Sequence, residues 1–215
     1  MIQQGFSFKA KHAWLLLFAA MIVFVFFNRD TALFDENSPL RRRYAVVPWW
    51  MLVHGIAGAV ALFLAPFQFS QRLRRRYLKL HRIMGRVYVA CVAVAAPASI
   101  PIAVILGPTI LIPAATLQAL GWIATTATAL YCIRTGRVEQ HREWMLRSYP
   151  FAMVFIVVRV LVAVPAIDRM GELGLALVVW PTIAVAGILP SFLLAWKHLA
   201  AGAPAALTPD RRLAA

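Results

Sequence analysis

Six long apolar segments dominate this sequence, and they restrict the chain to very few folds. Each approaches or exceeds the roughly 20 residues that an α-helix needs to cross a hydrocarbon core about 30 Å thick. With 62% hydrophobic and only 14% charged residues, the chain does not have the composition of a soluble domain. Helices and closed β-barrels are the only structures that span a bilayer, and the segments lack the strict alternation of barrel strands. The sequence therefore predicts an all-α polytopic membrane protein, a bundle of six transmembrane helices.

The expected helices lie at about residues 13–27, 46–69, 83–106, 109–133, 144–166 and 173–196. The first of them follows two lysines and resembles a signal peptide, but the next residues, NRDTALFDENSPL, offer no convincing small-residue cleavage site. We therefore expect this segment to remain as a helix. Residues 197–215 are expected to form a short cytoplasmic tail, and the chain has no room for a soluble catalytic domain. The whole sequence is expected to be one integral membrane domain.

Basic residues gather on one side of the expected membrane. The N-terminus, the loops at 70–86 and 134–147 and the tail carry nearly all of the formal net charge of +14, whereas the loops at 28–45 and 167–172 are together neutral. Short cytoplasmic loops collect Lys and Arg, so both termini are expected in the cytoplasm, with the protein in the bacterial inner membrane. Anionic lipid headgroups are the expected partners of these loops, and nothing calls for nucleic acid.

Three polar residues fall at a similar depth in the outer halves of separate helices: His54, Gln118 and Arg159. His54 lies about 12 Å from the outer end of its helix, at 1.5 Å per residue. An arginine at such a depth costs at least ~2.5 kcal/mol unless it finds a partner or reaches the interface. One interpretation is a pocket in which Arg159 binds an anionic or carbonyl group beside His54 and Gln118. The other is that Arg159 extends to the outer headgroups and His54 only packs.

The segments LHRIMGRVY and HREWMLRSY have a similar residue pattern, and both lie at the expected cytoplasmic side of the membrane. Each places a histidine and an arginine at the mouth of a helix, with another arginine and a tyrosine further along. Arg82 and Arg86 would share a helix face. An inner site for a phosphate, a propionate or a lipid headgroup would therefore contain His81, His141, Arg82, Arg86 and Arg147. The same residue types are also common at membrane interfaces without any specific ligand.

Familiar catalytic and metal-binding patterns do not occur in this sequence. We find no HExxH, Walker or GxSxG motif, and no carboxylate pair inside an expected span. Cys91 and Cys132 lie in or at the edge of expected helices, where packing is their expected role and a disulfide is not expected. The sequence therefore assigns no catalytic residue.

The run HGIAGAVALFLAPFQFSQRLRRRYLKLHRIMGRVYV, with HREWMLRSY and VVRVLV further on, resembles a widespread family of predicted bacterial membrane proteins whose domain has no assigned function. The resemblance covers about residues 49–161 and implies a polytopic helical bundle without a verified activity. A looser similarity is to six-helix transmembrane b-type cytochromes, which hold two haems with four histidines. It implies that His81 and His141 would ligate one haem iron at the inner face. The outer face offers only His54, so one haem or none fits better than two.

Three functions follow from these observations. The first is electron transfer with a bound b-haem or quinone, at the inner histidines or in the outer pocket. The second is a non-enzymatic accessory subunit of a larger membrane complex, docking through the aromatic first helix or the Gly/Ala-rich second and third helices. The third is the transport of a small anion attracted by Arg159, for which the sequence shows no inverted internal repeat.

Overall fold

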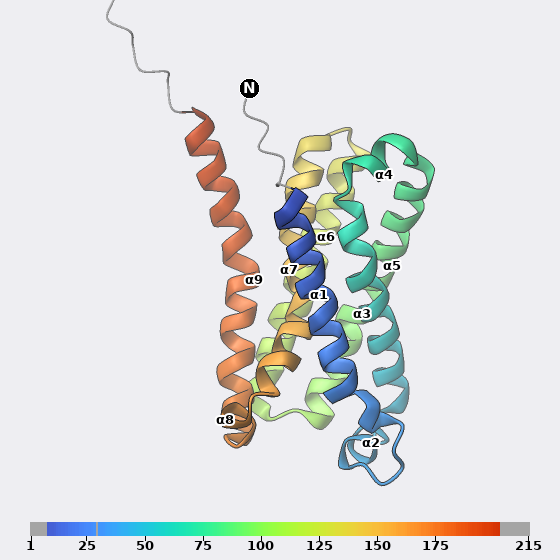
Figure 1. Cartoon of the computed structure of the whole chain (residues 1–215), viewed down its shortest axis with the longest axis vertical. Coiled ribbons are helices and arrows are strands. Elements are labelled where there is room, and N and C mark those ends of the chain that lie inside the picture. Colours follow the sequence, from blue (N-terminus) through green and yellow to red (C-terminus); the bar gives the residue numbers. More distant parts are fainter. Residues whose placement is uncertain (1–7, 29, 203–215) are drawn as a thin grey trace, which may run out of the picture.

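A computed structural model describes residues 8–28 and 30–202, which form helices joined by short connections (Figure 1). No β-strand occurs in these two ranges. The helices are, in chain order, α1 (Phe8–Asn28), η1 (Asp30–Leu33), α2 (Pro39–Tyr44), α3 (Pro48–Gln68), α4 (Gln71–Arg76), α5 (Leu78–Leu106), η2 (Thr109–Leu111), α6 (Ile112–Arg134), α7 (Val138–Val162), α8 (Pro165–Asp168) and α9 (Gly171–Gly202).

Six of these helices are long and apolar enough to cross a membrane, namely α1, α3, α5, α6, α7 and α9. Their candidate spans have mean hydropathies between 1.4 and 2.4. Each corresponds to one of the six apolar segments in the sequence. The expected fold class is therefore confirmed, and the chain is an all-α polytopic membrane protein.

The helices extend beyond the apolar segments at several ends. α5 begins at Leu78 and α7 at Val138, five and six residues before the positions expected from apolarity. Apolarity marks the hydrocarbon core, whereas Lys, Arg, Glu and Gln are good helix formers that continue a helix into the interface. α7 ends at Val162, four residues early, because Pro165 lacks a backbone N–H and begins α8. Residues 197–202 of the expected tail continue α9, and the remainder of that tail, 203–215, lies outside the described residues.

Four of the helices, α3, α5, α6 and α7, form a four-helix bundle. Each packs against the next along the chain, and α7 returns to touch α3, so that α3 faces α6, and α5 faces α7, across the diagonals. α1 lies against α7 and also places the Phe18 ring 6.4 Å from the Phe63 ring of α3. α9 packs mainly on α7 (Figure 1). The space between the diagonal pairs is where a ligand or a polar network can be held.

Small residues bring the bundle helices close together. Ala61, Ala65, Ala95 and Ala129 have no exposed surface, and Tyr88 is equally buried among them. Alanine permits close backbone approach where lipid supplies no hydrophobic driving force between helices. A Tyr in such a core indicates that its hydroxyl has polar partners there.

The two ends of the bundle differ in what covers them (Figure 1). α2 and α8 lie at one end, called the α2 end here, where α3 and α6 begin and α5 and α7 finish. α4 lies at the other end, the α4 end, where α5 and α7 begin. In the orientation predicted from charge, the α2 end faces the outside and the α4 end the cytoplasm.

Candidate functional site: a cavity at the α2 end

The α2-end half of the bundle contains a cavity of about 440 Å³. α2 and the five spanning helices α3, α5, α6, α7 and α9 all contribute to its wall. Most of the wall is apolar, and its residues with polar side-chain atoms are Arg43, Tyr44, His54, Ser99, Gln118, Trp122 and Arg159. The three residues predicted to share an outer pocket therefore line the same cavity, from the diagonal helices α3 and α6 and from α7.

His54 is held by a backbone carbonyl of the neighbouring helix. Its Nδ1 lies 2.8 Å from the Ala95 oxygen on α5. A carbonyl oxygen can only accept, so Nδ1 carries the proton and donates it to this bond. In the neutral ring, Nε2 is then an acceptor. The cavity wall thus contains an imidazole of fixed tautomer that is able to accept a hydrogen bond.

Arg159 is half-buried and contacts an aromatic ring in the cavity wall. Its guanidinium carbon lies 4.3 Å from the centroid of Phe155, one helical turn earlier on α7. The Phe155 ring also meets the His54 ring edge to face, with 6.1 Å between centroids. Phe155 therefore packs between the arginine of α7 and the histidine of α3, and the cation–π contact stabilises the charge at this depth.

Gln118 on α6 contributes an acceptor. Its Nε2 donates to the Phe151 carbonyl of α7 across 3.2 Å, which fixes the orientation of the amide. The Oε1 atom keeps acceptor capacity in this orientation. The cavity wall therefore combines two acceptors, on His54 and Gln118, with the guanidinium donors of Arg159.

Arg43 is a cavity residue that the sequence analysis missed. It projects from α2, and its guanidinium donates to the Leu106 carbonyl at the end of α5, 2.5 Å away. In the sequence it stands only among the charges of the loop at 28–45. A signal was present, because Ser38 followed by Pro39 is a typical helix start and the Ser38 hydroxyl does cap α2 by accepting from the Leu40 N–H.

Trp122 lies one turn deeper than Gln118 on the same face of α6, and a chain of buried hydroxyls lies next to it. The indole Nε1 donates to the Tyr88 hydroxyl across 3.1 Å. Tyr88 is 2.8 Å from the Ser148 hydroxyl, which is 2.7 Å from that of Thr126. These four residues come from α5, α6 and α7 and are at most 5% exposed. These hydrogen bonds join α5, α6 and α7 at the centre of the bundle.

The histidines predicted for the inner site occupy the α4 end, far from the cavity. His141 on α7 places Nδ1 2.9 Å from the Ala129 carbonyl, so its Nε2 is the nitrogen left for a ligand. His81 on α5 has a buried Nδ1 without a hydrogen-bond partner. It also lies within electrostatic range of Arg74 and His141. The two imidazoles therefore lie at the same end of the bundle, on the diagonal helices α5 and α7, within electrostatic range of each other.

Gln68 is a polar residue of the α4 end that was not predicted as a site residue, although the run PFQF that contains it belongs to the family resemblance. It ends α3, is 8% exposed, and its Nε2 has no hydrogen-bond partner. Its Oε1 would lie 3.5 Å from a Cβ placed on Gly85, one turn after His81. Only the position of a glutamine at the end of an apolar span, in the run PFQF, could have indicated it.

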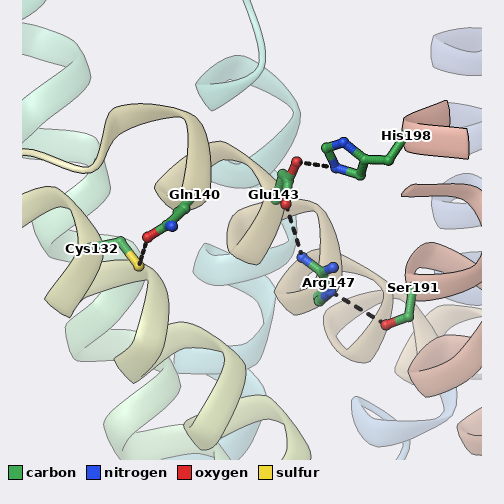
Figure 2. Close-up of polar contacts among 6 residues, drawn as sticks. All are labelled: Cys132, Gln140, Glu143, Arg147, Ser191 and His198. Atoms are coloured by element: carbon green, nitrogen blue, oxygen red, sulfur yellow. Dashed lines mark hydrogen bonds and ion pairs between the residues drawn. The ribbon is translucent and has the colours of Figure 1, made fainter. Parts of the chain in front are cut away.

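The arginines predicted for the inner site do not join the two histidines. Arg82 and Arg86 are exposed on the surface of α5. Arg147 contacts α9, where its Nε donates to the Ser191 hydroxyl across 3.3 Å (Figure 2). Its guanidinium also lies 4.8 Å from the Trp144 ring centroid. The five residues predicted for the inner site therefore do not form one site. The two histidines lie at the α4 end of the bundle, Arg82 and Arg86 lie on the surface of α5, and Arg147 lies against α9.

Glu143 links these α4-end contacts into a network between α7 and α9 (Figure 2). One carboxylate oxygen lies 3.8 Å from the Arg147 guanidinium, and the other lies 2.7 Å from His198 Nε2. Together with Ser191, these groups attach the end of α9 to α7. These contacts hold the two helices together, and none of the residues that make them lines the cavity.

The helices and the cavity define a class: a multi-pass helical membrane protein whose bundle contains a mostly apolar cavity with a few polar side chains in its wall. Residues 51–197 match the family described as Predicted membrane protein (DUF2306), and the chain belongs to that family. The matched region runs from α3 into α9 and confirms the first resemblance drawn from the sequence. No curated protein and no solved structure matches the chain. The similarity to b-type cytochromes gains no support from these comparisons and stays a prediction.

Proposed function

We propose that this protein binds a quinone or quinol in the cavity at the α2 end and takes part in electron transfer in the membrane. The observation that carries the proposal is the meeting of His54, Gln118 and Arg159 in one cavity of about 440 Å³ with mostly apolar walls. Such a combination of apolar wall and few polar groups is typical of small-molecule sites. It matches a ring that carries two oxygens and an apolar tail.

The hydrogen-bonding capacity of the wall favours the reduced, quinol form. A quinol has two hydroxyl groups, each able to donate, and the wall offers acceptors on His54 Nε2 and Gln118 Oε1. The guanidinium of Arg159 donates to a quinol or quinone oxygen. A simple anion would leave both acceptors unused, so the same wall supports an anion-transport function less well.

His54 also supplies the proton chemistry that quinol oxidation needs. Oxidation of a quinol to a quinone releases two electrons, which a separate redox partner in the membrane would take, and two protons, one of which an imidazole can accept. The Ala95 carbonyl that holds Nδ1–H stabilises the imidazolium formed when Nε2 takes this proton.

A second candidate concerns the α4 end, where His81 and His141 would hold one b-haem. Two observations fit the group: the imidazoles come from diagonal helices, and His141 has the backbone-bonded Nδ1 typical of a metal-ligating histidine. Arg74, which lies within electrostatic range of His81, would pair with a propionate in place of the exposed Arg82 and Arg86. A bound haem would supply a one-electron acceptor for quinol oxidation.

The quinol proposal is tested by titrating the purified full-length protein with a short-chain benzoquinol and following tryptophan fluorescence. His54→Ala and Arg159→Leu are each expected to weaken binding by about 5- to 150-fold, since each removes a buried hydrogen bond worth about 1–3 kcal/mol. Arg159→Lys is expected to bind weakly, because lysine keeps the charge but lacks the planar fork. Arg169→Leu, which removes an exposed arginine outside the cavity wall, is the matched control and should bind normally.

A chemically matched ligand sharpens this experiment. The dimethyl ether of the same quinol keeps the ring and its tail but cannot donate to His54 or Gln118, so it should bind at least about tenfold more weakly. Equal affinity for the quinol and its ether would contradict the proposed hydrogen bonds. Wild-type binding by Arg159→Lys would instead support an arginine that serves only as an interfacial anchor.

The haem candidate is tested by the absorption spectrum of the purified protein. If a b-haem is bound, His81→Ala and His141→Ala should each abolish its Soret band, because bis-histidine ligation needs both rings. His54→Ala should keep most of the band. A Soret band that survives in both α4-end variants would exclude this histidine pair as the ligands, and equal loss in all three would indicate a different pairing.

A further inference from the structure

The cavity ends at Trp122, and a buried polar cluster begins directly behind it. Trp122 belongs to the cavity wall, whereas its partner Tyr88 and the next hydroxyls, Ser148 and Thr126, do not. These three residues are 0–3% exposed. The indole therefore lies between a cavity that reaches the α2 end, where the exposed Arg43 contributes to its wall, and the hydroxyls at the bundle centre.

The hydroxyl cluster lies in line with the two histidines of the α4 end. Tyr88 follows His81 by seven residues on α5, and Ser148 follows His141 by seven residues on α7. Seven residues are two helical turns, about 10 Å along the axis. The hydroxyls and the two histidines thus follow one another along the interior of the bundle. With water between them, they would form a continuous polar path from the cavity to the α4 end.

Trp122 is unsuited to pass a proton into that path. A hydroxyl both donates and accepts, so a row of hydroxyls can relay protons. The indole N–H is a donor only. Its single proton is directed at the Tyr88 oxygen, 3.1 Å away. A proton that arrives from the cavity finds no lone pair on this ring to receive it.

We propose that the Trp122 indole is the barrier between the cavity and the α4 half of the bundle. Its bulk closes the cavity floor against water, and its donor-only nitrogen interrupts proton transfer to the hydroxyls. Tyr88 is a positioning residue, since it holds the indole across the bundle by accepting its N–H. This inference does not depend on a quinone, because the barrier would act on water and protons whatever the cavity binds.

The test measures whether a small reagent can reach the hydroxyl cluster. Ser148→Cys is introduced into full-length, quinone-free protein whose Cys91 and Cys132 have been replaced by Ala, and labelling by a small water-soluble methanethiosulfonate is followed by peptide mass spectrometry. Cys substitution at 148 should react slowly while Trp122 is present. Adding Trp122→Ala should accelerate labelling at least about tenfold, whereas Trp122→Phe, which keeps most of the bulk, should stay near the parent rate.

Matched variants make the result decisive. Trp180→Ala removes a partly exposed tryptophan of α9 outside the cavity wall and should leave labelling unchanged. If Trp122→Ala does not fold, Tyr88→Phe serves instead, because it frees the indole and should raise the rate several-fold. Fast labelling with Trp122 intact, or an unchanged rate in a folded Trp122→Ala or Tyr88→Phe protein, would overturn the barrier.

Proton passage is measured separately, in vesicles that contain the protein and a trapped pH-sensitive dye. Wild-type vesicles should hold an imposed pH gradient, and Trp122→Ala vesicles should lose it faster. Equal rates would overturn the proton-blocking part of the proposal. Neither experiment includes a quinol, so a failed quinol titration and a failed barrier test remain distinct results.

Discussion

Single side chains in this bundle act by filling narrow spaces between helices, and Phe151 is an example. Its ring is 7% exposed, and its carbonyl holds the Gln118 amide at the cavity wall. The ring fits because α6 has no side chain at Gly121. A Cβ built there would lie 2.7 Å from the ring atom Cζ. One missing methyl group therefore helps to position both the cavity wall and Gln118.

Gly121→Ala is accordingly expected to destabilise the protein by about 1–3 kcal/mol, because the buried Phe151 ring must move to admit the methyl group. Thermal unfolding in detergent, followed by helical circular dichroism, measures the effect. Gly55→Ala is the control, since nothing lies within 4 Å of its Cβ position and alanine favours helix. The double variant Gly121→Ala with Phe151→Leu should recover much of the loss. An unchanged melting temperature in the single variant would contradict this packing.

At the level of whole elements, the helices differ in how completely the bundle buries them. α7 lies at the centre, with buried residues from Met145 to Ile156, and contacts α1, α3, α6, α8 and α9. α1 has much less contact and keeps large apolar side chains exposed, such as Leu16 at 71% and Phe27 at 66%. Lipid or a second membrane protein would cover this face equally well. The accessory-subunit function therefore stays a prediction of the sequence.

α2 shows how a short element can complete a site. It has only six residues, but its cap at Ser38 and the bond from Arg43 to Leu106 attach it to the end of α5. Leu40, Arg43 and Tyr44 all belong to the cavity wall. The segment between the first two spans therefore contributes part of the site, although nothing in its hydropathy distinguishes it from a simple loop.

The whole molecule has two polar regions at opposite ends of one bundle. His54 and Gln68 mark them on α3, fourteen residues and about 21 Å apart along the axis. Between them, the core contains the Trp122 indole and the hydroxyl cluster. The bundle therefore keeps the polar groups of the cavity apart from those of the α4 end.

The location of the charge predicts the orientation of the molecule in the membrane, and topology reporters can measure that orientation. Because nearly all of the net charge of +14 lies at the α4 end and in the terminal segments, reporter fusions at Pro39 and Met170 should give periplasmic signals. Fusions near Arg75 in α4 and near Arg137 between α6 and α7 should give cytoplasmic signals. A cytoplasmic signal at Pro39 or Met170 would place the cavity on the inner side of the membrane.

The sequence by itself determined the fold class, the six spans and the depth of the polar residues. A bilayer requires every backbone polar group to be bonded within the span, so apolar length is enough to identify a helix, and 1.5 Å per residue is enough to place a side chain along it. For this reason His54, Gln118 and Arg159 were expected at one level, and the structure places them in the wall of one cavity.

Only the tertiary structure decided which way each helix faces. Rotation about a helix axis is set by packing against its neighbours and is not encoded in apolar length. That rotation leaves Arg82 and Arg86 exposed and directs Arg147 to Ser191 of α9. It also joins Trp122 to Tyr88, two residues 34 positions apart in the chain. The cavity floor and its hydroxyl cluster arise from three helices at once, and no single segment of the sequence contains them.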